Sequence, residues 1–239
     1  MLAVLAYLQR RLHYESQAIF LLLTRREDVA LALFSILFFP GVFLHEASHF
    51  LMARLLGVKT GRFSIVPQTL RDGRLQLGYV ETAGSDFVRD GLIGLAPLLA
   101  GSGVVGYLGL VHLDLQSIWS GIGEAGIRTV WTSFTALSER PDFWLWLYLL
   151  FAVSSTMLPS NTDRRAWLHI ALFASLLLIL AILAGAGPWM ISNVAPMVNQ
   201  FLRVLAIILA VSVGVHLLLF SPLWLVRRLL SRITKMAIV

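Results

Sequence analysis

The chain has 239 residues, of which 58% are hydrophobic and 13% are charged, and its formal net charge is +6. Soluble domains are about a quarter charged, so this composition excludes an ordinary soluble domain and indicates a protein embedded in a lipid bilayer. Cysteine is absent, which excludes disulfides, a cysteine-based zinc site and a thiol nucleophile. The cations are dispersed at the boundaries of apolar segments, so no nucleic-acid partner is expected.

Apolar segments of about 20 residues, the length that crosses a bilayer, recur along the chain. We expect an α-helical polytopic membrane protein with about five transmembrane helices, an N-terminal interfacial helix and a small β-hairpin at the membrane surface. The expected spans lie near residues 29–53, 88–112, 143–160, 166–187 and 201–225. They divide the chain into an N-terminal amphipathic segment (1–27), a core (28–165) and C-terminal helices with a basic tail (166–239).

The N-terminal segment mixes apolar residues with Arg10, Arg11 and His13. This pattern favours a helix that lies in the membrane interface over a span, with His13 at the interface. The charges follow the first apolar residues, so a cleavable signal peptide is not expected. Further basic residues flank the connection 57–84 and form the C-terminal tail, and the positive-inside bias assigns both to the cytoplasmic side.

The first expected span contains the run HEASH at residues 45–49, which puts two imidazoles and a carboxylate into an otherwise apolar stretch. Ionisable groups at membrane depth cost a few kcal/mol or more, so they need a compensating partner. Residues four apart share one face of a helix, so His45 and His49 can present ring nitrogens to one metal ion, with Glu46 beside it. This arrangement is typical of zinc hydrolases. Pro40 predicts a kink about one turn earlier.

Between residues 57 and 84 the sequence alternates as strands do, over 62–67 and 75–80. Asp72-Gly73 between the two runs is a strong hairpin signal. We expect the hairpin at the inner membrane surface, beside the helix that carries the two histidines. Its exposed edge could pair with an unwound peptide, or the hairpin could merely link two spans.

Two histidines leave a zinc ion short of one ligand, because catalytic zinc sites use three protein ligands and keep a position for water. Asp163 fits best, since it follows the third span at the depth expected for the histidine pair. It could equally be the N-cap of the next helix. Asp86 and Asp90 are less favoured acids, and Glu81 is the candidate if the ligand is a glutamate. Histidines at span ends more often bind a carbonyl or a headgroup than a metal: His112, His169 and His216.

These features together resemble the site-2 protease family of intramembrane zinc metalloproteases. The resemblance covers about residues 29–165. It rests on the HEASH motif in a first core helix, on the hairpin region 57–84, on the run Gly94-Leu95-Ala96-Pro97 near the start of a second helix, and on Asp163 after a proline-bearing third.

The resemblance implies a zinc metalloendopeptidase that hydrolyses peptide bonds within or near transmembrane segments of other membrane proteins. His45, His49 and Asp163 would be the metal ligands for Zn²⁺, which activates water and polarises the scissile carbonyl, and Glu46 would be the catalytic base. The candidates for substrate binding are Gly94, Pro97 and Ser155. The expected partners are a transmembrane protein substrate and the lipid bilayer, in a prokaryotic cell membrane with the active site toward the cytoplasm.

The chain departs from the family's pattern around Asp163. Ser155 stands near the place where the family's third helix often carries Asn, and Arg164 follows Asp163 where the family often has Gly. The outer connection is also too short for an inserted PDZ-like domain. These departures leave open an alternative function, a catalytically inactive protease-like membrane scaffold or metal-responsive regulator.

Overall fold

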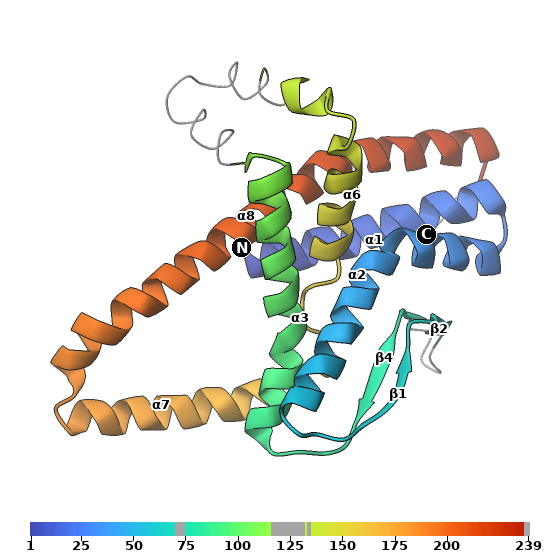
Figure 1. Ribbon diagram of the computed structural model, residues 1–239. Helices are drawn as coiled ribbons and strands as arrows, with labels where there is room; N and C mark the ends of the chain where they lie inside the picture. Colours follow the sequence, from blue (N-terminus) through green and yellow to red (C-terminus); the bar gives the residue numbers. More distant parts are fainter. Residues whose placement is uncertain (70–74, 116–131, 133–134, 237–239) are drawn as a thin grey trace.

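The computed structural model describes residues 1–69, 75–115, 132 and 135–236 of the chain. The described part is mostly helical, and its helices are α1 (Leu2–Thr24), α2 (Glu27–Leu55), α3 (Phe87–Tyr107), α6 (Phe143–Ser154), α7 (Trp167–Leu183) and α8 (Gly187–Thr234). A short π-helix, η1 (Leu108–His112), continues α3. Figure 1 shows α2, α3 and α6 packed together, with α1 and the second half of α8 running across them.

Three helices of the described chain are long and apolar enough to cross a bilayer: α2, α3 with η1, and α8. They suggest a membrane protein. The expected count of about five spans is not confirmed, because α6 has 12 residues and α7 has 17. At 1.5 Å per residue these helices are about 18 and 26 Å long, shorter than a hydrocarbon core of about 30 Å. The chain leaves α6 after Ser154, ahead of Pro159, which cannot donate to a helical ladder.

The helices α2 and α6 approach each other closely at Gly41. A Cβ atom on this residue would lie 2.2 Å from the carbonyl oxygen of Ala152 and 2.4 Å from Oγ1 of Thr156. Gly41 follows Pro40, which lies inside α2, and Figure 1 shows α2 changing direction between its two halves. The proline and the glycine together bring the second half of α2 against the end of α6.

The N-terminal segment forms the helix α1, and one face of this helix is covered by α8 and α2. Glu15 on this face is 2% exposed and pairs with Arg227 of α8. His13, expected at the membrane interface, is half-buried: its ring packs edge-on against Phe34 and Phe38 of α2, and its Nε2 atom is buried.

The segment between α2 and α3 forms the predicted hairpin as two short antiparallel sheets. Strand β1 (Thr60–Ser64) pairs with β4 (Tyr79–Thr82), and β2 (Gln68–Thr69) pairs with β3 (Leu75–Gln76). The expected continuous strand over 62–67 is interrupted, because Pro67 has no backbone N–H to donate. The predicted Asp72-Gly73 turn lies in 70–74, outside the described residues.

We predict that Gly41→Ala destabilises the protein by about 1–3 kcal/mol, because the added methyl group would meet the backbone of α6. The matched control is Gly103→Ala on α3, where a Cβ meets nothing within 4 Å and alanine should be neutral or stabilise by up to about 1 kcal/mol. Thermal unfolding in detergent compares the two variants. Equal unfolding temperatures for both would contradict the close approach of α2 and α6.

Candidate metal centre

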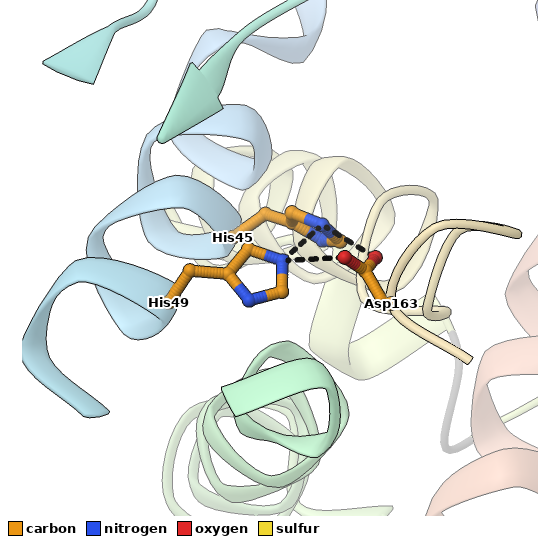
Figure 2. A group of neighbouring side chains, drawn as sticks. All are labelled: His45, His49 and Asp163. Carbon is orange, nitrogen blue, oxygen red and sulfur yellow. Dashed lines mark hydrogen bonds and ion pairs between the residues drawn. The ribbon is translucent and has the colours of Figure 1, made fainter. Parts of the chain in front are cut away.

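The second half of α2 presents His45 and His49 on one face, as the four-residue spacing predicts. Their Nε2 atoms lie 3.2 Å apart. Figure 2 shows both imidazoles directed toward a common point, which the Asp163 carboxylate approaches from the connection between α6 and α7. The helix thus supplies two ring nitrogens, and a separate segment supplies an oxygen.

Backbone carbonyls fix the protonation pattern of both rings. The Nδ1 atom of His45 lies 2.7 Å from the carbonyl oxygen of Thr156, and Nδ1 of His49 lies 2.9 Å from that of Ile93. A carbonyl oxygen can only accept, so both Nδ1 atoms must carry the proton. In the neutral rings each Nε2 atom then carries a lone pair and no hydrogen, and the two Nε2 atoms face each other at 3.2 Å. A proton or a metal ion shared by the two rings removes this repulsion, and ligand histidines are oriented in this way by a second hydrogen bond.

Asp163 completes a group of three donors. Its Oδ1 lies 3.4 Å from Nε2 of His49, and its Oδ2 lies 3.8 Å from Nε2 of His45. In the described part of the chain these three residues are the group whose donor atoms could hold a metal ion, all within 4.8 Å of one another. The expected convergence of the three residues is therefore confirmed.

The surroundings of Asp163 favour its ionised form. Burial acts to raise the pKa of this carboxyl, but the nearby imidazoles of His45 and His49 and the side chain of Ser160 lower the pKa by more. The backbone N–H of Ser160 also donates to Oδ2 at 2.7 Å. The alternative role as an N-cap does not hold, since α7 begins at Trp167 after Ala166. Arg164 is turned into its own loop, where its guanidinium donates to Ser160 and Asn161.

A glycine of α3 allows Asp163 to reach the histidines. A Cβ atom on Gly94 would lie 2.0 Å from the carbonyl oxygen of Asp163. The backbone of the connection after α6 thus rests directly on α3, and the same helix provides the Ile93 carbonyl that binds His49. The role observed for Gly94 is this close backbone contact.

The three donors lie on a cavity of about 680 Å³, within the range of ligand sites. Glu46, which is 9% exposed, lines the same cavity, and a Cβ atom on Gly78 would lie 2.8 Å from its Cγ. The hairpin residues 75–80 form one wall, and Gln9 and His13 of α1 contribute to another. Ser155 also lines the cavity, whereas Pro97 is buried within α3 and does not.

The other candidate ligands are engaged elsewhere. Asp86 is the N-cap of α3, and hydrogen bonds from the backbone N–H groups of Arg89 and Val88 lower the pKa of its carboxyl. Asp90 lines the cavity and accepts from Ser85. Three further candidates have partners or positions away from the donor group: Glu81 accepts from the backbone N–H of Arg62, His112 stacks on Trp146 at 3.7 Å, and His169 is exposed on α7.

The groups that orient the histidines could not be identified from the sequence. The carbonyls of Thr156 and Ile93 belong to every residue type alike, so no pattern could have identified them. The buried position of Gln9 was not predicted either. A polar glutamine directly after the apolar residues 1–8 is a signal that could have indicated a buried polar contact.

Comparisons of this chain with models of protein families, with curated proteins and with solved structures gave no match. The arrangement of His45, His49, Glu46 and Asp163 is therefore the basis for a functional assignment.

We predict that Asp163→Ala loses bound metal while Glu81→Ala retains it, because only the first carboxylate approaches both imidazoles. Elemental analysis of the purified proteins after dialysis measures metal per chain. Equal loss in both variants, or full retention in Asp163→Ala, would rule out the donor group described above.

We also predict that Gly94→Ala weakens metal binding by at least about tenfold, the lower range for losing an outer partner of a ligand, since its methyl group would displace the backbone of Asp163. Gly103→Ala on the same helix is the control, because its methyl group enters open space. Competition with a metal-binding dye gives the two dissociation constants. Similar values for both variants would contradict the contact.

Proposed function

We propose that this chain is an intramembrane zinc metalloprotease that hydrolyses peptide bonds within or near transmembrane segments of other membrane proteins. The observation that carries the proposal is the convergence of His45, His49 and Asp163 on one point of a cavity that Glu46 also lines. The two histidines and Glu46 come from a helix long and apolar enough to cross a bilayer. The resemblance of the HEASH run to the site-2 protease family points in the same direction.

The donor set fits zinc. Tetrahedral coordination with metal–donor bonds of about 2.05 Å separates two donor atoms by about 3.3 Å. The two Nε2 atoms are 3.2 Å apart, Oδ1 of Asp163 is 3.4 Å from Nε2 of His49, and Oδ2 is 3.8 Å from Nε2 of His45, so each imidazole has a carboxylate oxygen near this separation. Two imidazoles and one carboxylate, with no cysteine in the chain, also match the ligand types of catalytic zinc sites, which keep a fourth position open.

Each group of residues at the site has a separate role in the proposed hydrolysis. Zn²⁺ bound to the three ligands would supply a Lewis acid that makes water a nucleophile near neutral pH. Glu46 takes the proton from the attacking water and delivers it to the leaving amine. The Thr156 and Ile93 carbonyls keep the two histidines in the orientation and tautomer that ligation needs. Val42, Leu77 and Ile93 on the cavity wall limit bulk water around the reacting groups.

The hairpin offers a way to hold the substrate. An intact helix hides its carbonyls in internal hydrogen bonds, so a membrane segment must unwind before attack and needs new partners for its backbone. β4 pairs with β1 on one side, and residues 79 and 80 line the cavity. Addition of the unwound segment as a further strand next to β4 would satisfy its backbone groups beside Glu46. Ser155, on the cavity wall, is a second candidate contact.

The test is cleavage of a single-span fusion protein, with a Gly-Asn pair in its apolar segment, after reconstitution with the purified chain in liposomes. We expect cleavage that a chelator abolishes and added Zn²⁺ restores. Glu46→Gln should lower the rate by at least about 100-fold and leave the metal content unchanged, because it removes the general base and spares the three ligands.

Chelator-insensitive cleavage, or an unchanged rate in Glu46→Gln, would count against the proposal. Bound metal without cleavage of any such fusion protein would favour the metal-responsive regulator, and absence of bound metal would favour the scaffold. Glu139→Gln serves as the matched control, because this glutamate lies on the connection ahead of α6, away from the cavity.

A further inference from the structure

Three consecutive residues at the end of α6 are each held by a different helix. The side-chain amide of Gln9 on α1 donates to the Ser154 carbonyl at 2.6 Å. The Ser155 hydroxyl lies 3.1 Å from Nε2 of His216 on α8. The Thr156 carbonyl lies 2.7 Å from Nδ1 of His45 on α2. The short segment 154–156 is thus the point at which α1, α8 and the metal-ligand helix meet.

The direction of each hydrogen bond in this segment is determined. Nδ1 of His216 lies 2.8 Å from the Ser212 carbonyl, which can only accept, so Nδ1 carries the proton. In the neutral ring Nε2 is then an acceptor, and Ser155 must donate its hydroxyl proton to it. Gln9 likewise donates its N–H to a carbonyl. Each contact therefore has one donor and one acceptor, with no conflict between them.

These contacts are buried. His216 is 0% exposed, Ser155 3% and Gln9 7%. Removal of one partner would leave a buried polar group without its hydrogen bond, and such a group is costly to leave unpaired. The side chains of both helices therefore add to the hydrogen bonds that the end of α6 makes with its own last turn.

The position of the Thr156 carbonyl depends on this end of α6. Thr156 lies beyond the last residue of α6, and no backbone N–H among the described residues donates to its carbonyl oxygen. Thr156 is held by hydrogen bonds from its N–H to Val153 and from its hydroxyl to Ala152, and the two residues before it are also held from outside. Its position in turn keeps the proton on Nδ1 of His45 and turns Nε2 toward Asp163.

We infer that Gln9 and His216 are positioning residues for the metal centre, which hold the Thr156 carbonyl and thereby the tautomer and direction of the ligand His45. The inference rests on the metal site of the proposed function but not on proteolysis. It gives α1 and α8 a role beyond packing. A change in either helix would alter the position of segment 154–156 and, through the Thr156 carbonyl, the orientation of His45. Neither residue touches the donor group itself.

The first experiment reads the tautomer of His45 in metal-free protein by ¹⁵N NMR of histidine-labelled samples, with the signal assigned by His45→Gln. We expect the Nδ1–H form in the native chain. Gln9→Met and His216→Phe, which keep side-chain volume and remove the hydrogen bonds, should shift His45 toward a mixture of tautomers. Persistence of the pure Nδ1–H form in both variants would overturn the inference.

The second experiment measures Zn²⁺ affinity by competition with a dye. Removing an outer partner of a ligand histidine typically costs 10- to 100-fold in metal affinity, and these residues act one step further out, so we expect about tenfold weaker binding in each variant. Ser155→Ala should weaken binding similarly and Ser155→Thr should not, since threonine keeps the hydroxyl. If His216→Phe is not recovered as a folded protein, the comparison of Ser155→Ala with Ser155→Thr tests the inference in its place.

The controls are buried or ring-containing residues outside segment 154–156 and its partners. Ser16→Ala alters α1 at a hydroxyl that has no hydrogen-bond partner among the described residues, and His112→Phe removes an imidazole stacked on Trp146. Both should keep the native Zn²⁺ affinity. If the controls lose as much Zn²⁺ affinity as Gln9→Met and His216→Phe, the losses reflect a general decrease in protein stability, and the inference is overturned. Failure of proteolysis with unchanged results here would reject only the proposed function.

Discussion

Two hydrogen bonds from imidazole to backbone orient the histidines of the candidate metal centre. The Thr156 carbonyl holds Nδ1 of His45, and the Ile93 carbonyl holds Nδ1 of His49. With both protons committed, the two Nε2 lone pairs face each other, and a positive charge between them is the arrangement that relieves their repulsion. In this apolar helix the histidine pair forms, with Asp163, a group whose donor atoms could hold a metal ion.

The helices can deliver those carbonyls only because they lie closer together than side chains normally permit. Gly41 admits the end of α6 to the surface of α2, and Gly94 admits the backbone of Asp163 to the surface of α3. At each place the contact is with backbone, so a larger residue could not be accommodated by a change of rotamer. Small residues in membrane proteins are commonly explained by helix packing alone. In this chain the same contacts set the distances between metal-binding atoms.

The sequence predicted the part of the site that is local. The four-residue spacing of His45 and His49 places them on one helical face in any helix, and Asp163 could be selected because few acids lie near a span end. The hairpin also followed from alternation and from its Asp-Gly pair. The orienting carbonyls could not be predicted, since they depend on which helices meet and carry no residue signature. The length of α6 was overestimated because hydropathy continues past Ser154 although the helix does not.

The early end of α6 has a consequence for hydration. A 12-residue helix is much shorter than the thickness of a hydrocarbon core, so the segment that follows it begins close to His45, His49 and Asp163. Ser160, Asn161 and Thr162 in that segment are exposed and polar, directly ahead of Asp163. The proposed hydrolysis would consume one water per bond broken and would need a supply route through lipid, and this hydrophilic stretch offers a lining along which solvent could descend to the histidine pair.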